Sequence, residues 1–180
     1  VRSRGLGDVY KRQCPGGVVV PAFSDNGEIC TNGMSYHSRS GENANSAVLV
    51  SVSEKDYESS HPLAGMFFQQ KLERQAFEKG HGKCVVSTFE SFKKHEACKV
   101  LGKVVPTIGI NGRLGNCYEL LPAFLADSVI KGIEEFGKKL KGFDSADAVL
   151  TGIETRSSAP FMIERNENKM TNFENVYAIG

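Results

Sequence analysis

Apolar and polar positions follow a strand-like pattern at both ends of the chain and a helical pattern in the middle. Residues 18–23 and 28–31 are short apolar runs separated by a Ser-Asp-Asn-Gly turn signal, which predicts a β-hairpin. A third β-rich run covers residues 47–52. Further strands are predicted at residues 84–88, 148–151, 160–163 and 176–179.

Two helices are predicted in the central part of the chain. The first begins at Pro62, since proline is favoured at the first helical position, and ends at Gly80, since glycine is common just past a helix end. Its apolar side chains at helical spacing are expected to face the core: Leu63, Met66, Phe67, Phe68, Leu72, Ala76 and Phe77. The second helix is predicted from Pro122 to Gly142.

The region between the helices, residues 92–115, contains scattered glycines and is predicted to be an extended connection with little regular structure. On the second helix, Glu134 and Glu135 each precede a lysine by four residues, which predicts ion pairs along the helix. The overall order, three strands, a helical segment and three strands, places the chain in the α+β class. The length of 180 residues fits one domain or parts of two.

The most polar part of the chain is residues 32–47, NGMSYHSRSGENANSA. This stretch has neither strand nor helix periodicity, so it predicts a long loop, and such loops are uncommon in compact domains unless they bind something. The candidate substrate-binding residues are Asn32, Ser35, Arg39, Asn43 and Asn45, whose side chains can donate hydrogen bonds to a ligand. A solvated surface loop is the competing interpretation. No catalytic acid or base is assigned.

Two shorter motifs also suggest a ligand. Residues 152–160, GIETRSSAP, place Arg156 among hydroxyl groups, which suits an anionic or carbonyl-bearing partner, while a surface ion pair with Glu154 is the alternative. In the Cys14-Pro-Gly-Gly sequence, Gly16 and Gly17 would allow the backbone to approach a ligand closely. The thiol of Cys14 fits either a redox partner or a buried structural group.

Charge and cysteine content exclude several classes of function. Residues 3–13, SRGLGDVYKRQ, resemble a translated sequencing adaptor, so the native chain is expected to begin near Cys14. The total charge is +1, of which residues 1–13 contribute +3 (four Lys and Arg less one Asp), leaving −2 and no expectation of nucleic-acid binding. Five cysteines without a CxxC motif, and histidines without metal-ligand spacing, predict no metal site. No apolar run approaches the ~20 residues that span a bilayer. A cytoplasmic location is therefore expected.

Four motifs in this order, CPGGVVVPA, NGMSYHSRSGENANSA, GIETRSSAP and ENVYAIG, resemble the C-terminal half of the bacterial FAD-dependent dehydrogenases, a largely uncharacterised NAD(P)/FAD-dependent oxidoreductase family. The resemblance covers residues 14–180. It implies a β-rich, flavin-facing domain, a helical insert, and the last strand of a Rossmann-type FAD domain whose main part is missing. The implied division is 14–58 with 145–165, 59–144, and 166–180, after the non-native segment 1–13. The implied flavin-side residues are Gly16, Gly17, Glu154, Thr155, Arg156 and Gly180.

The resemblance implies an FAD-dependent oxidoreductase that transfers hydride or electrons between flavin and an unknown small organic substrate. NAD(P) is an open second cofactor, and the oligomeric state is also open. Because the sequence has no glycine loop to cradle phosphates, this region alone is expected to be inactive and not to hold FAD firmly. The alternative is a non-catalytic, β-rich binding module with a helical docking insert. The flavoprotein hypothesis requires the amide-rich segment 32–47 and the Arg156 turn to converge on one isoalloxazine ring, in a cleft shared with Gly180.

Overall fold

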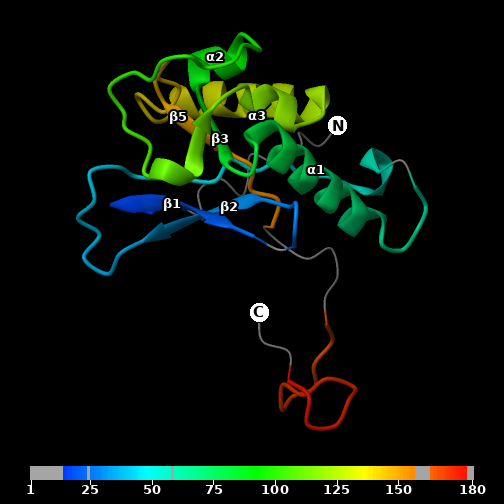
Figure 1. Cartoon of the computed structure of the whole chain (residues 1–180). Helices are drawn as coiled ribbons and strands as arrows, with labels where there is room; N and C mark the ends of the chain where they lie inside the picture. The colour runs from blue at the N-terminus through cyan, green and yellow to red at the C-terminus, as the bar shows by residue number, and fades with distance from the viewer. Residues whose placement is uncertain (1–13, 24, 58, 157–162, 178–180) are drawn as a thin grey trace.

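The described part of the chain folds into two small β-sheets and three α-helices (Figure 1). This mixed arrangement confirms the predicted α+β class. The computed structural model describes residues 14–23, 25–57, 59–156 and 163–177. Predictions on the remaining residues, including the adaptor-like segment, most of the strand at 160–163, and Gly180, lie outside the described residues.

The first sheet is the predicted hairpin, formed by β1 (Gly17–Ala22) and β2 (Cys30–Ser35). The strands are antiparallel, with Gly17 opposite Ser35 at the open end. The prediction that residues 32–47 form a loop throughout is wrong at its start, because residues 32–35 belong to β2. These residues are exposed, and main-chain hydrogen bonding to β1 holds them in the strand without apolar side chains.

The second sheet has the order β4-β3-β5, with β3 (Cys84–Thr88) in the centre. β4 (Gly112–Leu114) runs parallel to β3, and β5 (Val149–Gly152) runs antiparallel to it. All five residues of β3 are buried. The predicted strands at 84–88 and 148–151 are confirmed, whereas β4 lies inside the stretch predicted to be irregular. β3 lies within the predicted helical insert, residues 59–144, and β5 lies after the insert. Their pairing therefore joins the two segments in one sheet.

The α-helices are α1 (Ala64–Gly80), α2 (Phe89–Lys93) and α3 (Ala123–Gly137). Figure 1 shows the β1–β2 hairpin below the three-stranded sheet, with α2 at the top and α3 at the level of β5. α3 ends earlier than predicted because the chain turns back, and the Asp144 carboxylate occupies the space where a side chain of Gly137 would begin. The described residues also form three single-turn 3₁₀ helices: η2 (Glu54–Asp56), η3 (Gly109–Asn111) and η4 (Cys117–Leu120).

The buried face of α1 differs from the predicted Met and Phe stripe. Leu63, Met66 and Phe67 are 49%, 43% and 47% exposed, so their assignment to the core is wrong. The prediction is confirmed for Leu72 and Ala76, which are buried in the core with β3, and Phe68 and Phe77 pack against this core while partly buried. Aromatic residues lie on both sides of this helix, so apolar spacing alone does not identify the face that packs.

Two local predictions fail because they need partners that the fold does not supply. Residues 47–52 are extended but not a strand, since they have no ladder partner among the described residues. The lysine that pairs with Glu134 is Lys93, on α2, and Lys138 pairs with Glu135 three residues before it. The predicted ion pairs along α3 at a spacing of four are therefore wrong.

The C-terminal part of the described chain, residues 163–177, is organised by its own turns. The main-chain nitrogen of Thr171 donates to the oxygen of Val176 at 2.8 Å. A single antiparallel β-bridge joins Met170 to Tyr177. The predicted strand at 176–179 is thus represented by this one bridge in the part of the chain that the structure describes.

Burial of two thiols predicts a stability loss at alkaline pH. Burial raises the pKa of Cys84 to about 11 and that of Cys117 to about 12. An unfolded thiol has a pKa of about 8.5, so the unfolded state loses these protons first as the pH rises. The free energy of unfolding, measured in urea, should therefore fall between about pH 9 and pH 11. The fall should be smaller in a Cys84→Ala/Cys117→Ala variant; an equal fall would contradict this assignment.

Candidate functional site

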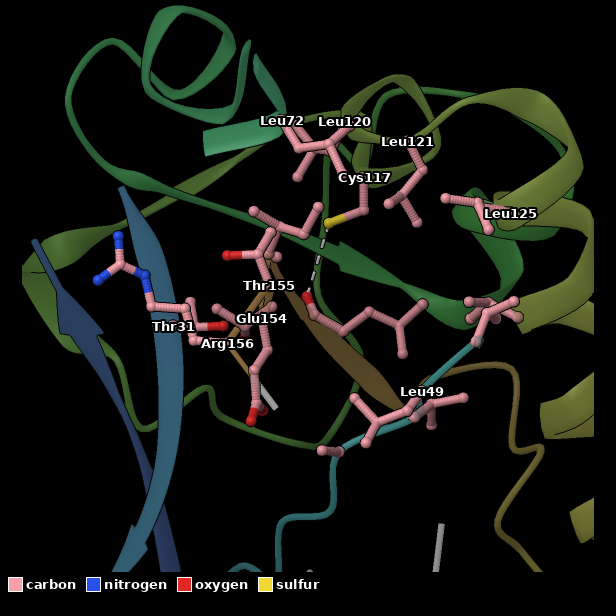
Figure 2. A pocket seen from close by; sticks show the side chains of 18 of the residues that line it. Thr31, Leu49, Leu72, Cys117, Leu120, Leu121, Leu125, Glu154, Thr155 and Arg156 are labelled. Atoms are coloured by element: carbon pink, nitrogen blue, oxygen red, sulfur yellow. Dashed lines mark hydrogen bonds between the residues drawn. The ribbon is translucent and has the colours of Figure 1, made fainter. Parts of the chain in front are cut away.

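A wide cleft of about 2790 Å³ opens between the hairpin, α1 and the sheet. Its apolar side includes Leu49, Leu121 and Leu125 (Figure 2). Three polar segments far apart in sequence reach the same cleft: Asn32 on β2, the loop around Asn43 and Asn45, and residues 154–156 after β5. The amide-rich segment and the arginine turn therefore line one cleft.

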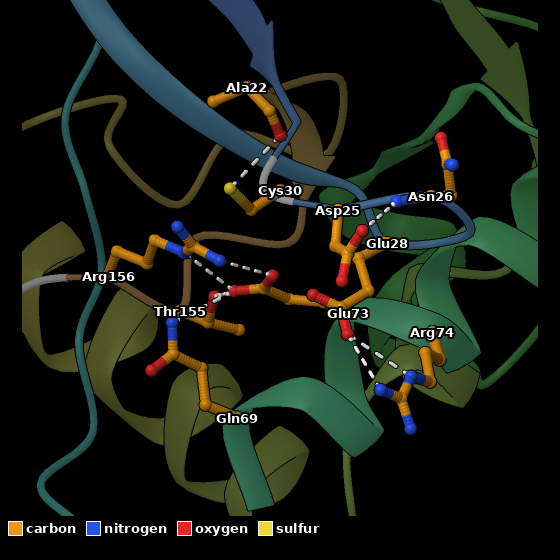
Figure 3. A network of polar contacts seen from close by, with 10 residues as sticks. All are labelled: Ala22, Asp25, Asn26, Glu28, Cys30, Gln69, Glu73, Arg74, Thr155 and Arg156. Carbon is orange, nitrogen blue, oxygen red and sulfur yellow. Dashed lines mark hydrogen bonds and ion pairs between the residues drawn. The ribbon is translucent and has the colours of Figure 1, made fainter. Parts of the chain in front are cut away.

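Behind the polar wall of this cleft, Thr155 and Arg156 converge on Glu73, a buried residue in the middle of α1 (Figure 3). Arg156 donates from Nε to Glu73 Oε1 at 3.0 Å and from Nη2 to Oε2 at 2.9 Å, a bidentate pair. Thr155 Oγ1 also donates to Oε1, as does Gln69 Nε2 at 3.0 Å. The side chain of Glu73 is 0% exposed and that of Arg156 is 47% exposed. The hydrogen bond to Glu73 raises the pKa of Arg156.

A second ion pair lies on the neighbouring part of α1. Arg74 donates from Nε to Glu28 Oε1 at 3.1 Å, and its Nη2 lies 3.0 Å from the same oxygen. Between the two pairs, burial and then the Glu73 carboxylate raise the pKa of the Cys30 thiol, which donates to the carbonyl of Ala22 at 3.2 Å. The Glu28–Arg74 pair thus joins the hairpin to α1, and the Glu73–Arg156 pair joins the segment after β5 to the same helix.

The carboxylate that pairs with Arg156 is not the one proposed from sequence. Glu154 was the alternative partner, whereas the structure gives Glu73, 83 positions away in sequence. Sequence reasoning missed Glu73 altogether. The available signal is a single glutamate among apolar residues on the buried face of α1, since a carboxylate there needs a partner.

Asn45, a candidate substrate-binding residue, makes its hydrogen bonds to the protein itself. Its Nδ2 donates to the carbonyl of Val18 at 2.8 Å and to that of Met34 at 3.3 Å. The amide fills the space above Gly17 and Gly33, where an added Cβ would lie 2.6 Å and 2.9 Å from its atoms. Asn45 therefore holds the polar loop across both strands of the hairpin.

The glycine pair after Cys14 allows a close approach between two backbone segments. Gly16 has φ +61°, and an added Cβ would lie 2.3 Å from the carbonyl carbon of Arg39. Gly17 donates its main-chain N–H to the carbonyl of Asn43 at 2.7 Å. The turn therefore packs on the polar loop, and Gly17 alone of the pair lines the cleft.

The remaining candidates fall into three groups. Asn43 lines the cleft while its Nδ2 donates to the carbonyl of Val105 at 2.8 Å. Asn32 lines the cleft, and its side-chain amide makes no hydrogen bond to another described residue. Ser35 and Arg39 are exposed and lie outside the cleft lining.

The described residues offer neither a metal-ligand cluster nor a membrane-spanning helix. Within residues 14–23, 25–57, 59–156 and 163–177, no group of three or more His, Cys, Asp or Glu side chains could hold a metal ion. In the same part of the chain, no helix combines the length and apolar character needed to cross a bilayer.

Comparison with known proteins shows which family the chain resembles. Residues 12–157 match the family model described as FAD-dependent protein, C-terminal domain-like. An uncharacterised protein of Clostridium beijerinckii is 45% identical over 155 residues, which cover 85% of this chain and 29% of that protein. The chain thus spans less than a third of the length of this relative. Because the family model covers most of its residues, the chain belongs to the family of FAD-dependent protein, C-terminal domain-like sequences.

Proposed function

We propose that the full-length protein is an FAD-dependent oxidoreductase that transfers hydride or electrons between FAD and a small organic substrate. In this proposal the cleft covers the flavin ring and forms part of the substrate site. The observation that carries it is the meeting of Asn32 and Arg156 in one cleft with a leucine-rich side. Membership of an FAD-dependent protein family supports the choice of cofactor.

The side chains of the cleft suit a flavin ring. The ring has an extended apolar body and an edge of carbonyl oxygens and nitrogens, which calls for apolar walls and a few directed donors. Leu49, Leu121 and Leu125 supply apolar surface, and the amide of Asn32 and Nη1 of Arg156 are donors without a partner among the described residues.

The same cleft does not suit the diphosphate of FAD. Its lining includes four carboxylates and two basic side chains: Glu42, Glu54, Asp147 and Glu154 against Lys55 and Arg156. With Glu73, which pairs with Arg156 behind the lining, five carboxylates face two basic groups, a net charge of −3. A cleft with a net negative charge disfavours the binding of negatively charged phosphate oxygens. We therefore assign the diphosphate to another part of the full-length protein.

The roles of the chain's own residues follow from these contacts. Bound FAD supplies the redox chemistry, and the protein supplies binding, orientation and electrostatics. Asn32 and Arg156 orient the polar edge of the ring or a carbonyl of the substrate by hydrogen bonding. The apolar side excludes water from the reacting face, which strengthens these hydrogen bonds.

Replacement of Asn32 tests the proposal with little effect on the fold. In the full-length protein, Asn32→Ala should weaken FAD or substrate binding about fivefold, the effect of one lost hydrogen bond. Titration of the apoprotein with FAD, and reduction of the bound flavin by NADH and NADPH, measure the two effects. Asn111→Ala, an exposed site outside the cleft, is the matched control. A full-length protein that binds no FAD, or an Asn32 variant that matches the control, would refute the assignment.

A further inference from the structure

Glu73 differs from the other carboxylates near the cleft because it is completely buried and four hydrogen bonds converge on it. Three of its donor atoms belong to Thr155 and Arg156, in the segment directly after β5. The main-chain oxygen of Glu73 also accepts from the nitrogen of Ile29, at 3.3 Å. One helical residue therefore connects α1, the hairpin and the arginine turn.

The arrangement fixes the direction of the Arg156 side chain. The fork of Nε and Nη2 is occupied by the two Glu73 oxygens, which leaves the two N–H groups of Nη1 and the second N–H of Nη2 as donors for a ligand in the cleft. A planar guanidinium held by two parallel hydrogen bonds has little freedom to rotate. The Thr155 hydroxyl is directed to the same carboxylate.

The arrangement also cancels the charge of Arg156. Without Glu73, the turn would present an uncompensated cation to the cleft, whereas the pair presents a dipole with no net charge. A unit charge beside a bound ring in a partly dehydrated cleft interacts with it far more strongly than in water. Glu73 thus controls both the geometry and the electrostatics of the turn.

We propose that Glu73 is a positioning residue that sets the reduction potential of the flavin ring through Arg156 and Thr155. This inference rests on the proposed function, because it requires the ring to lie against the arginine turn. A cation near the ring stabilises the reduced, more negative flavin. The neutralising carboxylate therefore keeps the potential lower than the arginine alone would.

The test is the midpoint potential of FAD bound to the full-length protein. Glu73→Gln keeps the size and an acceptor oxygen but leaves Arg156 uncompensated, so the potential should rise by about 30 mV, a tenfold change for a two-electron couple. Arg156→Gln removes the cation and should lower the potential, which provides a second measurement if Glu73→Gln does not fold. The double variant Glu73→Gln/Arg156→Gln removes both charges and should return the potential towards that of the wild type.

Matched variants separate the possible outcomes. Glu119→Gln removes a carboxylate from the exposed Lys79 pair, outside the cleft, and should leave the potential unchanged. If Glu154→Gln shifts the potential while Glu73→Gln and Arg156→Gln do not, the ring lies in the cleft but Glu73 has only a structural role, and the inference is wrong. If none of the cleft variants shifts the potential, the ring does not lie there, and the proposed function fails with it.

Discussion

Arg156→Gln should destabilise the chain by about 3 kcal/mol, because it leaves the Glu73 carboxylate buried without its counter-ion. The reverse change, Glu73→Gln, should cost only about 1 kcal/mol. The asymmetry arises because Arg156 is 47% exposed and water can solvate the cation left behind, whereas Glu73 is 0% exposed. Urea unfolding of the wild-type and variant chains measures both values.

Lys79 provides the control for this comparison. Its pair with Glu119 has about half of each side chain exposed, so Lys79→Gln should change the free energy of unfolding by less than about 1 kcal/mol. Equal losses for Arg156→Gln and Glu73→Gln would mean that the burial of Glu73 does not determine the energetics. A loss for Arg156→Gln no larger than that for Lys79→Gln would show that the bidentate pair behaves as a surface ion pair.

Gly16→Ala should also cost about 3 kcal/mol, since it combines a left-handed backbone with a steric clash. Gly16 has φ +61°, and the new Cβ would lie 2.3 Å from the carbonyl carbon and oxygen of Arg39 and 2.7 Å from the nitrogen of Gly41. All of these neighbours are backbone atoms, so no side-chain rotation relieves the contact. The turn after Cys14 and the polar loop would have to separate, which should expose the cleft side of the hairpin.

Gly27→Ala is the control that separates the cost of the steric clash from the cost of the left-handed backbone. It has φ +79°, and an added Cβ would meet nothing within 4 Å, so Gly27→Ala carries only the backbone cost, about 1 kcal/mol. The difference between the two variants in urea unfolding therefore measures the close approach of the two backbone segments. Similar values for Gly16→Ala and Gly27→Ala would mean that the loop moves aside without loss of stability.

Local sequence pattern was sufficient where an element depends on its own residues. The strand at β3 is a β-branched run after a glycine turn, and α3 has one unambiguous apolar face, so both were predicted. β4 was missed because it is three residues long and owes its structure to pairing with β3. Residues 47–52 were wrongly predicted as a strand because β propensity does not supply a partner.

The candidate site shows a similar division. The arginine turn and the amide-rich segment were identified by residue type, and both line the cleft. Residue type did not reveal that Asn45 is engaged with the carbonyls of Val18 and Met34, or that Arg156 is engaged with Glu73. Such pairings join residues distant in sequence, so a single sequence without its fold does not specify them.

The central position of β3 affects folding during synthesis, because its two partner strands are synthesised after it. β3 emerges well before its antiparallel neighbour β5, and until Gly152 has been synthesised one edge of a valine-containing strand has no native partner. Uncovered strand edges of this kind can pair with other chains. Nascent chains that stop before Gly152 should therefore depend most on chaperones.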